Sequence, residues 1–390
     1  MSKQNLDFPF FALGFRAFFV LAGLFALLSI TLWTSIFNGA LMVDNYYPNI
    51  YWHGHEMLLG YSVAVIAGFL LTAVKNWTGV QTLQGSKLAA LCMLWIYGRL
   101  VPFYSGVIPD ELIALIDFSF LPTLAYFLAK PILKAGNLRN LFFVGLLLLM
   151  ALGNGLIHAE ILNFSESSAE TGLDLVVAII IMIILTIAGR VFPFFTEKGL
   201  KGVIAIRNPL LDILSIVSSA AVFLLLIFDI NGWFLTLCSI LALIANMQRV
   251  SGWYVQKIWY VPLLWVLYMG YGWIMLGFVF VALSSLSIIP ASLATHAFTV
   301  GGIGVLTLGM MARVSLGHTG RVLKASNTIA IAFVLINLAA LFRVIMPAMM
   351  PSGYTGFLMI STYCWLAAFS LFIYVYSPIL STARIDGKAG

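Results

Sequence analysis

Runs of about twenty apolar residues recur from end to end of this 390-residue chain, and only short connections separate them. A run of this length crosses the hydrocarbon core of a bilayer when it forms a helix. Because 62% of the residues are hydrophobic and only 9% are charged, the chain holds more apolar surface than a soluble core of this size buries. The sequence therefore predicts a polytopic membrane protein.

Twelve transmembrane helices are expected, one for each apolar run. An open sheet leaves backbone groups unsatisfied in lipid, and the runs lack the alternation of a barrel strand. No hydrophilic insert is large enough for a second domain, so we predict an all-α fold with one transmembrane domain over residues 1–390. The predicted helices are 14–37, 56–78, 86–105, 111–133, 140–162, 171–196, 209–228, 232–248, 259–284, 290–312, 325–347 and 354–380.

The lysines and arginines predict the orientation of these helices. The connections near 38–55, 106–110, 163–170, 229–231, 285–289 and 348–353 contain none. By the positive-inside rule, twelve spans with this segregation place both termini in the cytoplasm. The net charge of +6 then reflects topology and contact with anionic lipid, and no nucleic-acid partner is expected. The basic residues of the tails and the alternate connections are Lys3, Lys75, Lys87, Lys130, Lys134, Arg139, Lys198, Lys201, Arg207, Arg249, Lys257, Arg313, Arg321, Lys324, Arg384 and Lys388.

The three cysteines exclude several classes of site. Cys92, Cys238 and Cys364 each stand alone in an apolar run, with no CxxC or CxxCH motif. Disulfides, zinc knuckles, thiolate iron–sulfur clusters and covalently attached c-type haem are therefore disfavoured.

Internal repeats are faint. A GRxxPF pattern occurs at 98–103 and at 189–194, and the spacing of His53 from Thr78-Gly79 resembles that of His296 from Thr319-Gly320. Neither similarity is strong enough to predict a duplication. A transporter built from two six-helix halves would usually show a longer central connection.

Histidine is scarce, with five residues in the chain, and its placement is uneven. The predicted topology puts four of the five in one external layer, and assigns only His318 to the cytoplasmic side. Imidazole is the commonest metal ligand and the usual axial ligand of haem. The four external histidines are His53, His55, His158 and His296.

Residues next to these histidines support a metal-binding layer. Gly54 would let the His53 and His55 rings converge, and Met57 offers a sulfur ligand suited to copper(I). Glu56 and Glu160 lie close to two of the histidines and are candidate proton carriers. The alternative is that each histidine is an interfacial group hydrogen-bonded to water or to a carbonyl.

Four arginines fall inside predicted helices: Arg16, Arg99, Arg190 and Arg343. They either snorkel to an interface or pair with carboxylates, or they hold anionic groups such as haem propionates. Arg99 and Arg343 are the preferred propionate partners because they lie on the external side with the four histidines. The candidate pairing carboxylates are Asp117, Asp174 and Asp212.

Glycines crowd the predicted helix 290–312, at Gly301, Gly302, Gly304 and Gly309. Small residues let two helices approach closely in lipid. The same bare surface would also let a flat macrocycle lie against the backbone below His296. Both interpretations stand at this point.

Several blocks of the sequence resemble the NnrS family, and they run in the family's order through residues 9–323. The blocks are PFFALGFRAFF at 9–19, WHGHEM at 52–57, AGFLLTAVKNWTG at 67–79, GRVFPFFT at 189–196, PLLWVL at 262–267, ATHAFTVG at 294–301, MAR at 311–313 and LGHTGR at 316–321. Tyr268 departs from the pattern, because the family often has histidine at that position.

The resemblance implies a multi-pass protein of the bacterial inner membrane that contains haem b and copper and protects against nitric oxide. With the external layer, it favours His53, His55, His158 and His296 as the metal ligands. His318, Arg99 and Arg343 are further candidates for cofactor binding.

The expected chemistry is reductive if the protein is an enzyme. Nitric oxide would be coupled to nitrous oxide, with electrons from membrane quinol and protons through Glu56 or Glu160. One alternative is a proton-coupled transporter of a small molecule or metal ion that uses the histidines and glutamates as a relay. A passive assembly partner is a third possibility, and the sequence gives no oligomeric state.

Overall fold

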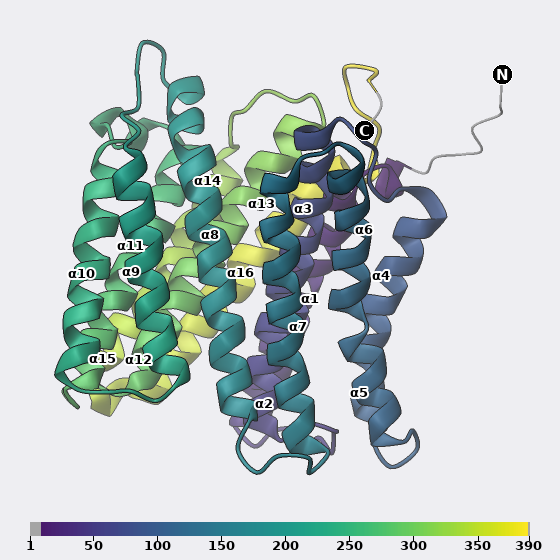
Figure 1. The fold of residues 1–390 in the computed structure, drawn as a ribbon, viewed down its shortest axis with the longest axis vertical. Coiled ribbons are helices and arrows are strands. Elements are labelled where there is room, and N and C mark those ends of the chain that lie inside the picture. Colours follow the sequence, from purple (N-terminus) through teal and green to yellow (C-terminus); the bar gives the residue numbers. More distant parts are fainter. Residues whose placement is uncertain (1–8, 389–390) are drawn as a thin grey trace. The chain divides into compact units, whose positions relative to one another are not determined.

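The computed structural model describes residues 9–388 and contains helices but no named strand in that range (Figure 1). The all-α membrane fold is therefore confirmed. Eleven helices in the described part of the chain are long and apolar enough to cross a membrane. They are Gly14–Phe37, Asn49–Thr78, Asp110–Lys134, Leu138–Ile161, Ala169–Gly199, Pro209–Ile227, Trp233–Ser251, Pro262–Ser285, Ala291–His318, Asn327–Met349 and Pro351–Ser381.

The predicted span 86–105 is the one that falls short. It forms helix α4, Gly85–Leu100, followed by a 3-10 turn at Val101–Tyr104. Pro102 has no backbone N–H to donate to the carbonyl four residues back, and α4 ends two residues before it, after 16 residues. At about 1.5 Å per residue this helix is shorter than the roughly 30 Å hydrocarbon core.

The described residues form two compact units. Unit 1 comprises residues 9–176, 314–322 and 372–388, and unit 2 comprises residues 177–313 and 323–371. The boundaries fall inside helices α8 (Ala169–Gly199), α13 (Val305–His318) and α16 (Tyr354–Ser381). The single transmembrane domain and the cytoplasmic termini stay predictions, and Lys3 lies outside the described residues.

Unit 1 packs its first helix against the second membrane-crossing segment, α1 against η2 and α3. Its complete helices are η1 Pro9–Phe11, α1 Gly14–Phe37, α2 Asn49–His55, η2 Glu56–Ser62, α3 Val63–Thr78, α4 Gly85–Leu100, η3 Val101–Tyr104, α5 Asp110–Phe118, α6 Phe120–Lys134, η4 Leu138–Asn140 and α7 Leu141–Ile161.

Unit 2 packs α11 against α10, α12 and η6. Its complete helices are α9 Pro209–Ile227, α10 Trp233–Ser251, η5 Gln256–Tyr260, α11 Pro262–Ser285, α12 Ala291–His296, η6 Ala297–Gly304, α14 Asn327–Ala340, η7 Leu341–Ile345, α15 Met346–Met349 and η8 Pro351–Gly353.

Three membrane-crossing helices contain π-helical segments, η2, η6 and η7. A π-helical turn holds an extra residue, and such turns often occur at functional sites. His55 is the last residue before η2, and His296 is the last residue before η6. Arg343 lies inside η7. The π-helical segments therefore indicate where a functional site could lie.

The glycines of η6 serve helix packing. A Cβ at Gly301 would lie 2.7 Å from Trp273, one at Gly302 would lie 2.7 Å from Ile274, and one at Gly304 would lie 2.7 Å from Trp365. Side chains therefore cover the glycine surface already. The expectation that a macrocycle lies against this surface is wrong, because close helix contact leaves no room for it.

Candidate metal centre

His55 and His53 point to different surroundings, although they share helix α2. The His55 side chain is fully buried, whereas the His53 ring stacks on Trp33 with centroids 4.3 Å apart. Residues two apart on an α-helix do not face the same way. Because Gly54 stays inside the helix, the expectation that it lets the two rings converge is wrong.

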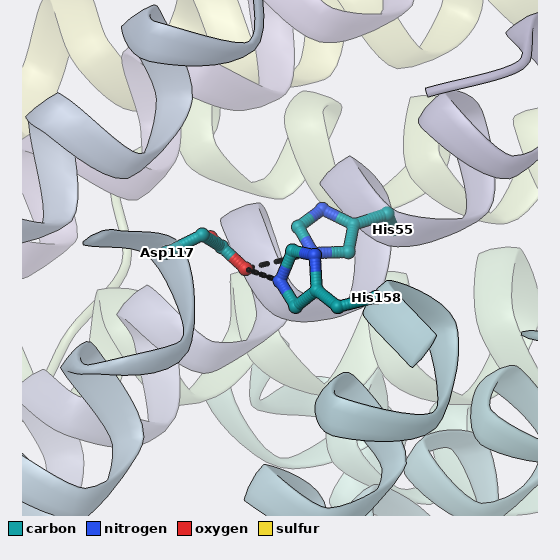
Figure 2. Close-up of side chains that lie close together, drawn as sticks. All are labelled: His55, Asp117 and His158. Carbon is teal, nitrogen blue, oxygen red and sulfur yellow. Dashed lines mark hydrogen bonds and ion pairs between the residues drawn. The ribbon is translucent and has the colours of Figure 1, made fainter. Parts of the chain in front are cut away.

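His158 and Asp117 meet His55 from two other helices of unit 1. Asp117 lies at the end of α5 and His158 near the end of α7, and both are buried. Figure 2 shows the two imidazoles and the carboxylate pointing toward one another. One ligand atom from each of the three residues lies within 4.8 Å of the others.

The oxygen Oδ2 of Asp117 is the meeting point. It lies 3.1 Å from His55 Nε2 and 3.0 Å from His158 Nε2 (Figure 2). Asn154 donates to the same oxygen at 2.8 Å. Tetrahedral donors around an ion with bonds of about 2.0–2.1 Å lie about 3.3 Å apart. Two of the three donor pairs thus stand close to the spacing that a single metal ion requires.

Glu56 orients the His55 ring for this role. Its Oε1 lies 3.0 Å from His55 Nδ1 and would hold the proton of a neutral ring on Nδ1 when Nε2 binds a metal. Nε2 then offers a lone pair toward Asp117 Oδ2 and toward Asn154 Oδ1, which lies 3.1 Å away. In that tautomer His55 Nε2 and Asp117 Oδ2 could both act as ligands to one cation. A carboxylate behind a ligating histidine is a common outer-shell arrangement in metal sites.

Arg99 closes the cluster on the side of the two carboxylates. Its Nη1 lies 3.1 Å from Glu56 Oε2, and its Nη2 pairs with Asp117 Oδ1. With neutral imidazoles the cluster holds two carboxylates and one guanidinium, all buried. One negative charge is left over. Burying it in a membrane protein is costly unless a cation or a proton joins the cluster.

Two tyrosines from the connection before α2 complete the surroundings. Tyr46 OH lies 3.0 Å from His158 Nδ1, and Tyr47 OH lies 3.0 Å from His55 Nε2. The connection is held in place because Tyr46 N donates to Pro102 O and Tyr47 N donates to Asn45 Oδ1. Burial raises the pKa of both phenols above the usual range, so both keep their protons at neutral pH.

The other predicted site residues lie elsewhere. In unit 2, Arg343 Nη2 donates to His296 Nε2 at 3.0 Å. In unit 1, the His318 ring lies against Phe15, with centroids 5.7 Å apart. Glu160 accepts from Ala169 N at 2.7 Å and from Tyr51 OH at 3.1 Å, which is the position of a group that caps the start of α8.

Three further residues that the sequence singled out have structural contacts. Met57 Sδ accepts from Ser29 Oγ at 3.5 Å. Arg16 donates to Leu380 O and Thr382 O at the end of α16. Tyr268, the departure from the family pattern, donates to Trp253 O at 2.7 Å within unit 2. Of the candidate pairings, Arg99 with Asp117 is present, whereas Asp212 pairs with Arg249.

The sequence did not identify Asp117, Asn154, Tyr46 and Tyr47 as site residues. The sequence indicates Asp117 only as a partner for an arginine. Its signal was a carboxylate in the middle of an apolar run, which deserves a functional reading by default. Asn154 gave a similar but weaker signal, one turn before His158. Nothing in the sequence pointed to the two tyrosines.

The chain was compared with curated proteins and with models of protein families. No match was found among curated proteins. A family model described as "NnrS protein" matches residues 9–384.

Proposed function

The chain belongs to the NnrS family, and from this premise we propose that it is a copper- and haem-containing protein of the bacterial inner membrane that protects against nitric oxide. The observation that carries the proposal is the buried convergence of His55, Asp117 and His158 in unit 1. These three residues would hold one metal ion.

The donor set favours a transition metal. Two imidazole nitrogens and one carboxylate oxygen suit copper, zinc or iron, whereas calcium and magnesium prefer oxygen ligands. Among divalent first-row ions copper binds such sites most tightly. A copper ion would also balance the excess negative charge of Glu56, Asp117 and Arg99 taken together. We therefore assign copper to this centre.

Haem b is the second cofactor of the proposal, but the residues around His55, His158 and His296 do not fit a macrocycle in this structure. Asp117 Oδ2 lies within 3.1 Å of both His55 Nε2 and His158 Nε2, so a carboxylate fills the space between the rings. His296 Nε2 accepts from Arg343, and Trp273, Ile274 and Trp365 cover the glycines of η6. We derive no step through haem.

The proposed reaction is the reduction of nitric oxide by membrane quinol. Two molecules of nitric oxide and one quinol give nitrous oxide, water and quinone, so two electrons and two protons are transferred. Copper, when bound, would supply redox chemistry and a position for nitric oxide. Glu56 would orient the His55 ring, and Arg99 would hold the Asp117 carboxylate in place. The buried Tyr46 and Tyr47 would keep bulk water out of the centre.

Glu56 is the better of the two candidate proton carriers. It is buried and lies 3.0 Å from His55 Nδ1, so a proton held there stands one imidazole ring away from the centre. Glu160 is occupied at the start of α8 and, in this account, serves structure.

Purified protein with a quinol donor tests the proposal. We expect copper bound in a one-to-one ratio with the chain and repeated turnover of nitric oxide. His158→Ala should abolish both, and Asp110→Asn, an exposed residue of α5, should change neither. A single stoichiometric consumption would limit the protein to binding nitric oxide. A metal-free protein that carries protons with a solute in vesicles would instead establish the transporter alternative.

A further inference from the structure

The segments that begin with His55 and His296 share the same order of backbone structure. Each histidine ends a short α-helix that continues as a π-helix, η2 of 7 residues or η6 of 8. The same number of residues separates His55 from Thr78 as separates His296 from Thr319. Each threonine precedes a glycine in the left-handed region, Gly79 with φ 70 and Gly320 with φ 75.

An arginine follows in the next membrane-associated helix in both cases. Arg99 lies at the end of α4, with Pro102 shortly after it, and Arg343 lies in η7, with Pro347 shortly after it. Arg99 pairs with Glu56, the residue after His55. Arg343 donates directly to His296. The arginine therefore reaches the start of the π-helix in both.

The charges at the two places are opposite. Arg99 has two carboxylate partners, whereas no carboxylate among residues 9–388 forms an ion pair with Arg343. The buried Nη1 of Arg343 has no hydrogen-bond acceptor in the described part of the chain. Arg343 is half-buried, and a guanidinium in a membrane-spanning helix is costly without a counter-charge, so this position favours an anion.

His296 orients the guanidinium and leaves it charged. Its Nδ1 donates to Ser292 O at 2.6 Å, so Nε2 is the acceptor for Arg343 Nη2 at 3.0 Å. The ring of Tyr354 lies 5.6 Å from the guanidinium carbon, and the Tyr354 side chain is a second hydrogen-bond partner of Arg343. Neither neighbour is a carboxylate, and Nη1 stays without an acceptor in the described part of the chain.

We propose that unit 2 holds an anion site at Arg343 and His296, and that its ligand is a planar oxyanion of the carboxylate class. Guanidinium binds such anions with directed, charge-assisted hydrogen bonds. The anion accepts from Nη1 while His296 fixes Nη2. The site is separate from the copper centre of unit 1, whose ligand is a cation, and it does not depend on that assignment.

Formate is the probe for a free small anion. Titration of the purified protein with sodium formate, against sodium chloride at equal ionic strength, should give saturable binding by calorimetry. Arg343→Gln should abolish it, and Arg343→Lys should weaken it at least tenfold because the planar fork is lost. Arg139→Gln, which removes an exposed arginine, should bind formate normally.

A second measurement covers a carboxylate that arrives on a larger bound group. The visible spectrum and mass of any pigment isolated with the protein are compared between the natural chain and Arg343→Gln. Loss or displacement of a pigment by the substitution, without formate binding to the natural chain, assigns the carboxylate to that group. If formate fails to bind and Arg343→Gln leaves the bound material unchanged, the proposal is overturned. Copper content is measured in parallel and should be equal in all Arg343 variants.

Discussion

His55 and His296 each lead into a π-helix, yet the two places bind opposite charges in our account. Around His55, helices α5 and α7 deliver Asp117 and His158, and the cluster carries excess negative charge. Around His296, Arg343 is the charged neighbour. The same α-helix to π-helix pattern thus positions both histidines. The side chains that other helices contribute around each histidine determine whether the place binds a cation or an anion.

The largest effect is expected from removing the carboxylate that joins the cluster. Asp117→Asn leaves Arg99 with one carboxylate and removes a proposed metal ligand, and breaking a buried ion pair costs about 3–5 kcal/mol. Thermal unfolding in detergent and metal analysis should both show the loss. Asp110→Asn on the same helix is the matched control and should behave as the natural chain. Unchanged copper in a folded Asp117→Asn protein would remove Asp117 from the ligands.

Alanine substitutions in the two π-helices separate packing from ion binding. A Cβ at Gly60 would lie 2.8 Å from Glu56 Oε2 and 3.3 Å from Arg99 Nη1, and one at Gly301 would lie 2.7 Å from Trp273. Both changes should destabilise the fold by about 1–3 kcal/mol. Only Gly60→Ala should also lower copper affinity.

The controls for this pair are glycines with open space around them. Gly145→Ala in α7 and Gly272→Ala in α11 meet no atom within 4 Å and should not destabilise the protein. Equal copper affinity in Gly60→Ala and Gly301→Ala would argue against a role for the Glu56–Arg99 pair at the centre.

A smaller effect on copper affinity is expected from removing a hydrogen bond to the ring nitrogen of His158 that faces away from Asp117. Tyr46→Phe removes the hydroxyl 3.0 Å from His158 Nδ1. Losing one such hydrogen bond costs about 1 kcal/mol in stability and, behind a ligand, about tenfold to a hundredfold in metal affinity. Competition with a copper chelator measures this. Tyr97→Phe, at an exposed tyrosine, should leave the affinity as it is, and an equal loss there would point to a general effect.

The smallest effect is expected at His53. Its ring stacks on Trp33 outside the cluster, so His53→Ala should keep full copper content and lose at most about 1 kcal/mol in stability. His55→Ala, two residues away on α2, should lose the metal. Reversed results for this pair would return His53 to the ligand set that the sequence suggested.

The sequence predicted the all-α fold and eleven of the spans because bilayer thickness sets the length of an apolar run. It missed the early end of α4, which stops at Leu100 inside an apolar stretch, two residues before Pro102. The π-helices leave no trace in an apolar pattern, so their positions after His55 and His296 became visible only in the structure.

The site was harder to predict than the fold. Scarcity of histidine led to His55 and His158, but the grouping by layer also included His53 and His296, because distance from the membrane surface says nothing about which helices are neighbours. Asp117 and Tyr47 enter the cluster through helix packing and a docked connection. Those contacts depend on tertiary structure, which spacing along the chain does not encode.

X-ray absorption at the copper edge of the purified, copper-loaded protein tests the central claim most directly. Our account predicts one copper per chain with two imidazole ligands and an oxygen at about 2.0–2.2 Å, and no sulfur. Sulfur in the first coordination shell, or the same spectrum after His158→Ala, would contradict it.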